Sequence, residues 1–174
     1  MKKRTANGLF AMIVLMAPLF AGCQATETVI HAKDGANYAL NDTVSTGGAV
    51  YTVKEVKTTE ERNAYAKEAE QVVTITYEVM NTQEDEELMA GADIAAYSNE
   101  TMDGEALDDY PLSVGSKYAG GLLYEGDKTT VIEAVSVPKD VTTLTILLDA
   151  TNPMNKGVTV TAANASDSHT LFHR

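Results

Sequence analysis

The sequence predicts an all-β protein built as an antiparallel β-sandwich. Short segments rich in Val, Ile, Thr and Tyr recur along the chain, and apolar residues alternate with polar ones within them. Gly, Asn, Asp and Pro separate these segments, and no helical pattern alternates with them as a parallel sheet would require. About seven to nine strands result, which is typical of two packed sheets.

The beginning of the chain predicts where the protein resides. Three basic residues precede an apolar run of about 12 residues, which is too short to span a bilayer but fits a secretory signal. The run ends in Phe20-Ala21-Gly22 directly before Cys23, a pattern that resembles the bacterial lipobox. The resemblance implies cleavage between Gly22 and Cys23 and a diacylglycerol thioether on Cys23, which would anchor the protein outside the cell membrane.

The signal and the strand pattern divide the chain into four parts. We expect a lipoprotein signal peptide over residues 1–22, a polar tether over 23–37, a sandwich domain over 38–163 and a flexible tail over 164–174. Residues 29–31 could instead add an edge strand. Cys23 is the only cysteine, so disulfides and Cys-ligated zinc are excluded.

The charge of the chain excludes one class of partner. The net charge is −12, and removal of the signal leaves 10 basic and 25 acidic residues, a net charge of −15. Such a surface repels the phosphate backbone, so we do not expect nucleic-acid binding. It also repels anionic headgroups, so contact with the membrane should come through the lipid anchor.

The strands are predicted from alternation and turn signals. The strongest covers residues 71–81, where Val73, Ile75, Tyr77 and Val79 occupy one face. Residues 58–70 contain helix formers but little to bury, which favours a short surface helix or a mobile loop. Residues 105–110 could continue as a short strand. The other expected strands cover residues 42–46, 49–56, 93–97, 129–137, 144–149 and 157–162.

Several turn and strand signatures match one family. They are Gly48-Ala49-Val50-Tyr51-Thr52-Val53-Lys54-Glu55-Val56, Glu78-Val79-Met80-Asn81, Asp103-Gly104, Tyr124-Glu125-Gly126-Asp127-Lys128, and the strand over 131–137 followed by Pro138-Lys139-Asp140. They resemble the uncharacterised immunoglobulin-like domain of Gram-positive lipoproteins, which is similar in fold to a small secreted mycobacterial antigen. The resemblance covers roughly residues 38–163. It implies an extracellular immunoglobulin-like antiparallel β-sandwich and no known chemistry.

One long acidic region could bind a cation. Between Lys67 and Lys117 the chain has 13 Asp and Glu residues and no Lys or Arg. Carboxylate oxygens suit Ca²⁺, but the spacing here is not that of an EF-hand loop. A solvated acidic face is the alternative that we prefer. The candidate calcium ligands are Asp103, Glu105, Asp108 and Asp109.

Catalytic patterns are weak in this sequence. His169 and His173 are four residues apart, but a disordered tail is the simpler interpretation, and His31 lies alone in the expected tether. Neither a Gly-x-Ser-x-Gly elbow nor a Ser-x-x-Lys motif is present. We therefore do not expect an enzyme, although a buried histidine or charged pair in a cleft would favour an envelope hydrolase.

These observations predict a lipid-anchored extracellular lipoprotein with a non-catalytic module that needs no cofactor. Its partner is expected to be an extracellular protein, a peptide or an envelope component, because sandwich modules commonly bind partners with loops or edge strands. The alternative is a lipoprotein that binds a cation or small ligand through the acidic loops of residues 84–109.

Overall fold

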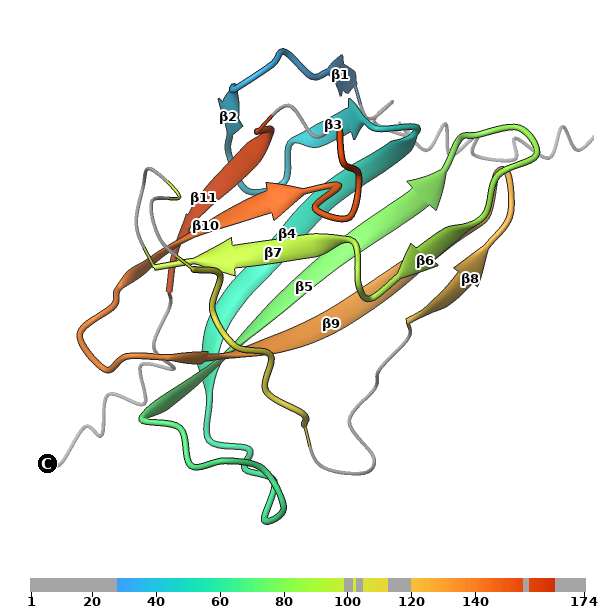
Figure 1. Cartoon of the computed structure of the whole chain (residues 1–174). Helices are drawn as coiled ribbons and strands as arrows, with labels where there is room; N and C mark the ends of the chain where they lie inside the picture. Colours follow the sequence, from blue (N-terminus) through green and yellow to red (C-terminus); the bar gives the residue numbers. More distant parts are fainter. Residues whose placement is uncertain (1–27, 99–101, 103–104, 113–119, 155–156, 165–174) are drawn as a thin grey trace, which may run out of the picture.

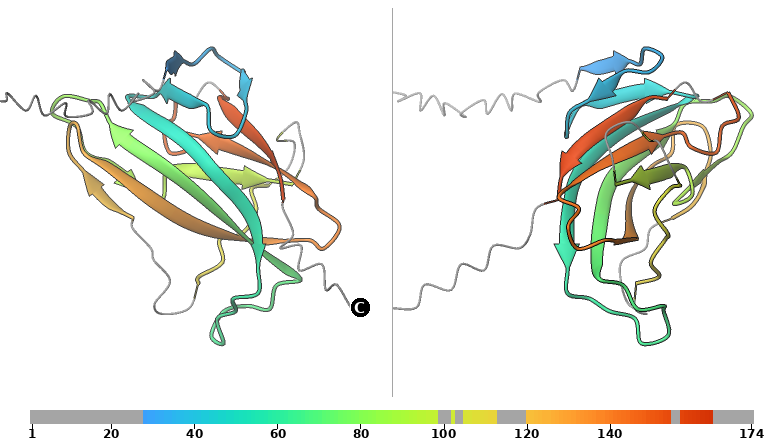
Figure 2. Two further views of the ribbon diagram at one scale, coloured as in Figure 1. Left: turned by 180° about the vertical axis from the view of Figure 1, so that it is seen from behind. Right: turned by 60° about the vertical axis from the view of Figure 1, so that its left-hand side comes forward.

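The computed structural model describes residues 28–98, 102, 105–112, 120–154 and 157–164, and these ranges form strands, turns and coil without a helix (Figure 1). Two sheets pack against each other, and a small two-stranded sheet lies beside them (Figure 2). None of the described ranges therefore contains an apolar helix of membrane-spanning length. The predicted all-β sandwich is confirmed.

The larger sheet has five strands in the order β1-β3-β4-β5-β9. All neighbours in it are antiparallel except β1, which runs parallel to β3. β4 and β5 are long and pair over nearly their whole length, so they form the centre of the sheet. The strand bounds are β1 (Val29–His31), β3 (Thr43–Thr46), β4 (Ala49–Thr59), β5 (Gln71–Asn81) and β9 (Lys128–Val137).

The second sheet crosses one face of the first and has the order β2-β11-β10-β7 (Figure 1). Its strands are antiparallel apart from β2, which pairs in parallel with β11. A separate antiparallel pair, β6 and β8, lies beyond the end of this sheet. The bounds are β2 (Asn37–Tyr38), β7 (Ile94–Tyr97), β10 (Thr143–Leu148), β11 (Thr159–Ala163), β6 (Leu88–Ala90) and β8 (Gly121–Leu123).

The hydrophobic core fills the space between the two large sheets. The predicted apolar face of β5 is fully buried there, as the period-2 pattern requires. A β-bulge between Val53 and Glu55 shifts the register of β4, so that Val56 returns to the inner face. Each fully buried side chain stabilises the fold by roughly 1.5–3 kcal/mol. The largest of them are Tyr51, Tyr77, Ile75, Leu144, Ile146 and Leu148.

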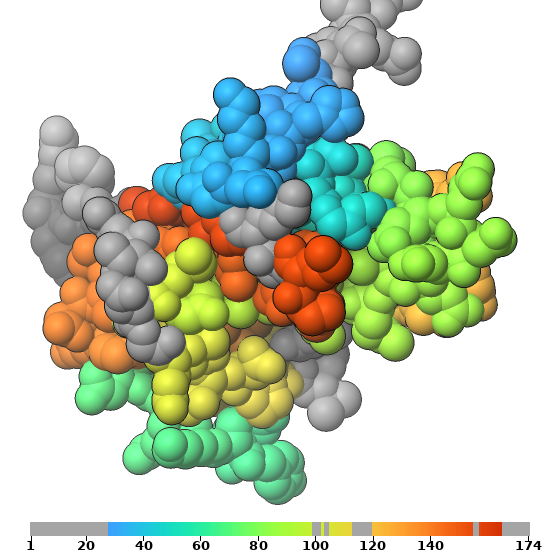
Figure 3. Space-filling model, turned by 45° about the horizontal axis from the view of Figure 1, so that its top comes forward, coloured from blue at the N-terminus to red at the C-terminus, as the bar shows by residue number. Residues whose placement is uncertain are grey.

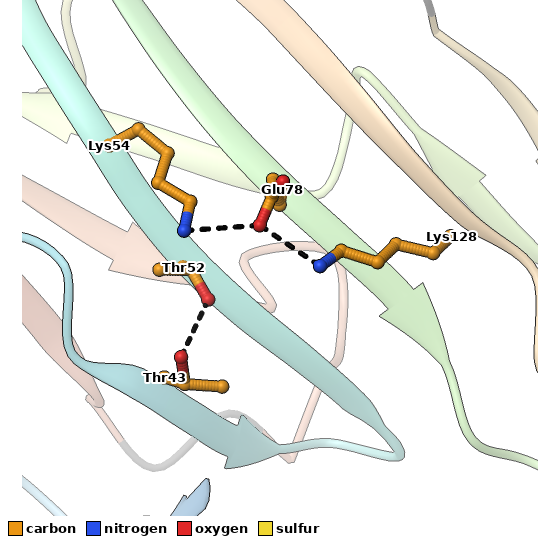
Figure 4. Close-up of polar contacts among 5 residues, drawn as sticks. All are labelled: Thr43, Thr52, Lys54, Glu78 and Lys128. Atoms are coloured by element: carbon orange, nitrogen blue, oxygen red, sulfur yellow. Dashed lines mark hydrogen bonds and ion pairs between the residues drawn. The ribbon is translucent and has the colours of Figure 1, made fainter. Parts of the chain in front are cut away.

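Polar side chains gather around Glu78 on the larger sheet (Figure 4). Glu78 on β5 accepts from Lys54 Nζ at 3.1 Å and from Lys128 Nζ at 3.0 Å, and the hydroxyls of Thr43 and Thr52 lie 3.0 Å apart. The hydrogen bond from Lys128 lowers the pKa of the Glu78 carboxyl. Because these groups are partly solvated, the ion pairs contribute little to stability.

The folded part of the chain begins before residue 38. Residues 29–31 form the edge strand β1, which was the alternative to a tether, and Asn37 begins β2. The expected tether over 23–37 is therefore incorporated into both sheets from Val29 onward. β1 is held by parallel pairing with β3, and β2 by parallel pairing with β11. Pairing of this kind depends on distant strands, so a polar composition does not reveal it.

Other segments depart from the predicted strand pattern. β4 extends to Thr59, and the loop that follows contains a turn and no helix within residues 60–70. Residues 105–110 form a single antiparallel bridge, between Asp109 and Val135, in place of a strand. β6 and β8 were not predicted, because three-residue strands are too short to show alternation.

Some predicted features lie outside the described residues. These are the signal peptide with Gly22 and Cys23, the turn at Asp103-Gly104, and the tail from residue 165 with His169 and His173. Residue 164 is the last described residue, and its backbone N–H donates to Thr142 O at 2.8 Å.

Candidate functional site

Residues 105–112, which we call the bridging segment, connect the edges of the two large sheets. Leu107 N donates to Ala96 O of β7 at 2.8 Å, which holds the segment to the second sheet. Ser136 N of β9 donates to Asp108 O at 2.8 Å, and Tyr110 N donates to Ala134 O at 2.7 Å. The segment therefore covers the side of the sandwich between β7 and β9.

Tyr110 fixes the far end of the bridging segment. Its ring is buried with Val72 and Ala134 on the outer face of the larger sheet. Its hydroxyl accepts a hydrogen bond from Asn63 N at 3.0 Å, and Asn63 Nδ2 donates to Pro111 O at 3.0 Å. Figure 3 shows the bridging segment (yellow) next to the loop of residues 60–70 (green).

A cleft of about 340 Å³ lies between β7, β9 and the bridging segment. Its apolar walls include Ile94, Leu107 and Val135, and its carboxylates are Asp108, Asp109 and Glu133. A neighbouring cleft of about 630 Å³ uses residues 106–109 as a shared wall. That cleft carries one basic residue, Lys67, and the carboxylates of Glu68, Glu70, Glu105, Asp108 and Asp109.

Glu133 reaches this cleft because of its place on β9. It occupies the same face of the strand as Val131, Val135 and Val137, whose side chains point into the core. Its own side chain therefore enters the space between the sheets. Only 9% of the residue is exposed. Glu133 also lines a smaller hollow of about 200 Å³ together with Asp109.

A buried tyrosine connects Glu133 to a second carboxyl. Tyr77 Oη lies 2.7 Å from Glu133 Oε1 and 2.6 Å from Asp93 Oδ1, and both Tyr77 and Asp93 are at most 1% exposed. Gly91 N donates to Tyr77 Oη at 3.2 Å and to Asp93 Oδ1 at 3.1 Å. We call Tyr77, Asp93 and Glu133 the carboxyl–tyrosine cluster.

The turn that carries Asp93 requires glycine at position 91. Gly91 has a φ of 91°, which side chains rarely allow, and a Cβ added there would lie 3.2 Å from Gly120 Cα. This backbone conformation brings the Gly91 N–H to the cluster. The turn after β6 therefore places Asp93 behind Tyr77, as seen from the cleft.

The cluster must hold two protons if both short contacts are hydrogen bonds. The phenol supplies only one proton, so one of the two carboxyls has to be protonated. Burial raises the pKa of the Glu133 carboxyl to about 7; the Tyr77 hydrogen bond opposes this shift, and the charges of Asp93 and Asp109 add to it. The Glu133 carboxyl can therefore supply the second proton below neutral pH.

Two polar atoms near the cluster are buried without hydrogen bonds. Within the described residues, Asp93 Oδ2 and Tyr51 Oη have no hydrogen-bond partner. Burial raises the pKa of both Tyr51 and Tyr77, so both phenols stay neutral. Burial also raises the pKa of Asp149, whose charge acts on Tyr51 from the end of β10.

The predicted calcium ligands are only partly brought together. Glu105, Asp108 and Asp109 are exposed and line the 630 Å³ cleft, whereas Asp103 lies outside the described residues. In the part of the chain that the structure describes, no three acidic, His or Cys side chains form a group able to hold a metal ion. His31 lies on β1, at the opposite edge of the larger sheet from β9.

The carboxyl–tyrosine cluster was not predicted from the sequence. For Glu133 a signal exists, since it is a charged residue at a position whose neighbours two residues away are buried valines. For Asp93 no comparable signal exists, because it lies in the turn before the short strand β7. Its contact with Tyr77 depends on the turn after β6.

Comparisons with known proteins identify solved structures with the same fold. No protein-family model matches the chain, and no curated protein sequence matches it. Among solved structures, yjhA from Bacillus subtilis aligns with a TM-score of 0.50 and 19% identity, covering 71% of this chain and 99% of yjhA. The candidate lipoprotein ycdA from Bacillus subtilis aligns with a TM-score of 0.51 and 18% identity over 69% of this chain. This chain shares their fold.

The aligned region covers 38% of ycdA, so this chain matches only a part of that protein. MPT63, a secreted protein from Mycobacterium tuberculosis, aligns with a TM-score of 0.46 and 17% identity, over 78% of this chain and 98% of MPT63. At identities below 20%, the likenesses to yjhA and ycdA establish the β-sandwich architecture but do not establish a function.

Proposed function

We propose that this protein is a lipid-anchored, extracellular and non-catalytic β-sandwich module that binds a basic segment of a peptide or protein. The observation that carries the binding function is the 340 Å³ cleft, in which Asp109 and the buried Glu133 lie beside apolar walls. This combination suits a ligand with a cationic end on an apolar stem.

The charge and shape of the cleft support a lysine or arginine side chain as the bound group. The exposed Asp108 and Asp109 concentrate negative charge at its surface, which attracts a cation and repels an anion. Ile94, Leu107 and Val135 can cover the methylene groups of such a side chain, while the ammonium or guanidinium group meets the carboxylates.

The edge of β9 supports an extended peptide as the carrier of that side chain. β9 is the outermost strand of the larger sheet. The bridging segment occupies its edge from Ala134 to Ser136, and within the described residues no strand pairs with the edge before Ala134. Extended peptides bind sheet edges through main-chain hydrogen bonds, and pockets along the edge select their side chains. The cleft lies next to this edge, so a peptide there could insert one basic residue.

The positions of the carboxyls support a binding function over an envelope hydrolase. Asp93 and Glu133 form a buried acidic pair, which is the kind of feature that would favour a hydrolase. Glycosidases need both carboxyls to flank the scissile bond. Here Glu133 lines the cleft, whereas Asp93 lies behind Tyr77 and does not. The pair shares a hydroxyl group and does not face one substrate from two sides.

The lipobox-like sequence before Cys23 supports the anchor, and with it a location on the outer face of a bacterial cell membrane. Two acyl chains, each burying many methylene groups, would hold the protein stably. The candidate lipoprotein status of ycdA, whose fold this chain shares, agrees with this proposal. Membership of the immunoglobulin-like lipoprotein domain family is part of the same proposal.

A binding measurement with a defined peptide tests the proposed function. The full chain, purified as the cell processes it and kept in mild detergent, is titrated with a capped peptide of alternating Ala and Lys. We expect saturable binding that is weakened about tenfold by Asp109→Asn, because one charge-assisted contact is lost. A peptide with Gln in place of Lys should not bind.

Glu84→Gln is the matched control, since it removes one exposed acid from the turn between β5 and β6, away from the cleft. It should bind the lysine peptide as the unmodified protein does. Equal weakening by Glu84→Gln and Asp109→Asn would show only a general charge effect, and equal binding of the Gln peptide would exclude the proposed site.

A further inference from the structure

We propose that a cation entering the 340 Å³ cleft expels the proton shared by Tyr77, Asp93 and Glu133, so that ligand binding is coupled to proton release. This inference rests on the proposed binding function and adds its regulation by pH. The geometric basis is the pair of short contacts, 2.6 and 2.7 Å, that one phenol makes with two carboxyls.

Glu133 is the member of the cluster that an incoming cation meets. It lines both the 340 Å³ cleft and the smaller hollow, whereas Asp93 is 1% exposed and lines neither. Oε1 of Glu133 contacts Tyr77, and within the described residues Glu133 makes no other hydrogen bond or ion pair. Its second oxygen is therefore available to a ligand.

In the described part of the chain, the titratable groups that face Glu133 come from three other elements, and none of them is basic. Tyr77 faces it from β5, Asp93 from the turn before β7, and Asp109 from the bridging segment. Burial and the charges of Asp93 and Asp109 favour the neutral form of Glu133 against the hydrogen bond from Tyr77, and a cation in the cleft would supply the missing positive charge. The protonated carboxyl is thus the resting state below neutral pH, and the carboxylate is the ligand-bound state.

Binding of the cation releases one proton from the Glu133 carboxyl. The O–H bond of the Glu133 carboxyl breaks, its proton passes to a buffer base, and the carboxylate forms an ion pair with the ligand's ammonium group. Tyr77 keeps its own proton and continues to donate to one of the two carboxylates. Because one proton leaves, affinity should rise up to tenfold for each pH unit below the pKa of Glu133 and level off above it.

Calorimetry in two buffers of different ionisation enthalpy tests the proposal. The full chain is titrated with the lysine peptide at about pH 6, where Glu133 is protonated. We expect release of between about half and one proton per peptide bound. The Glu133→Gln variant should release no proton, whereas Asp109→Asn should bind more weakly and still release it.

The outcomes separate the two proposals. Binding without any dependence on buffer overturns the proton coupling and leaves the binding function intact. The absence of binding at every pH overturns both. Release of the same number of protons by Glu133→Gln overturns the assignment to Glu133. Should that variant fail to fold, the pKa of Glu133 can be followed by carbon NMR in the unmodified protein, where the peptide should lower it.

Discussion

Tyr77 and Glu133 occupy diagonal positions on neighbouring strands of the larger sheet, and their side-chain oxygens lie 2.7 Å apart inside the sandwich. Directly opposite them stand Val131 and Ile75, respectively, both fully buried. A polar contact within such apolar surroundings is strong when satisfied and unfavourable when broken.

Removal of the two buried phenol hydroxyls should have unequal consequences. Tyr77→Phe leaves the Asp93 and Glu133 carboxyls without their shared partner, which should lower the free energy of unfolding by about 1–3 kcal/mol. Tyr51→Phe removes a buried hydroxyl that interacts with Asp93 but makes no direct hydrogen bond within the described residues, so it should cost less stability than Tyr77→Phe. Urea unfolding of both variants measures the difference. Equal losses of stability would contradict the structure of the cluster.

Stability should decrease as the pH rises from about 5 to about 8. The Glu133 carboxyl has a pKa of about 7 in the folded protein, against an ordinary value near 4.3 when unfolded. Between these values the folded state binds the additional proton, so its contribution is present at low pH and disappears as the pH passes 7. The decrease is on the order of 3 kcal/mol. The raised pKa of Asp149 acts in the same direction.

The Glu133→Gln variant is the control for this pH dependence. An amide does not titrate, so its free energy of unfolding should change much less over the same range. Urea unfolding at several pH values gives the two profiles. If they run parallel, the titrating group is another residue.

Replacement of Cys23 by Ser should abolish lipid attachment. The lipobox-like sequence then lacks the thiol that would carry the diacylglycerol, so the protein should appear in the medium or as an unprocessed precursor. Membrane fractionation and mass spectrometry of the intact protein distinguish these states. If Cys23→Ser stays with the membrane and its mass differs from that of the unmodified protein only by the exchange of sulfur for oxygen, the lipoprotein assignment is excluded.

Calcium at millimolar concentration should leave the melting temperature unchanged. Glu105, Asp108 and Asp109 are exposed along one wall, and within the described ranges they form no group of three able to hold a metal. A specific site would stabilise the folded state by mass action. A rise in melting temperature that Asp108→Asn removes would support the cation-binding alternative over a basic peptide.

The central strands of the sandwich could be predicted from the sequence because their alternation and turn signals involve residues that are close together in the chain. β5 alternates strictly between Val73 and Val79, and the Gly47-Gly48 turn joins β3 to β4. Both glycines have positive φ, as a tight hairpin turn requires. The structure adds the bulge in β4, which explains why Tyr51, Val53 and Val56 all face inward although their spacing breaks the alternation.

The candidate site could not be predicted in the same way, because it depends on contacts between distant segments. The bridging segment is held by Ala96 of β7 and by Ala134 and Ser136 of β9, two strands that are far apart in the sequence. Its own sequence carries charge and little alternation. The acidic region between Lys67 and Lys117 is evident in the sequence, but Glu133, the buried carboxyl that lines the cleft, lies outside it among the valines of β9.

The strand order of the larger sheet has a consequence for how the module would stand on a surface. β1, the first described strand, and β9, which borders the cleft, lie at opposite edges of the sheet. Four inter-strand spacings separate them, or about 19 Å. A bilayer holding the amino-terminal end would thus leave the cleft on the distal side of the domain, raised by the width of the sheet itself and open to approaching molecules.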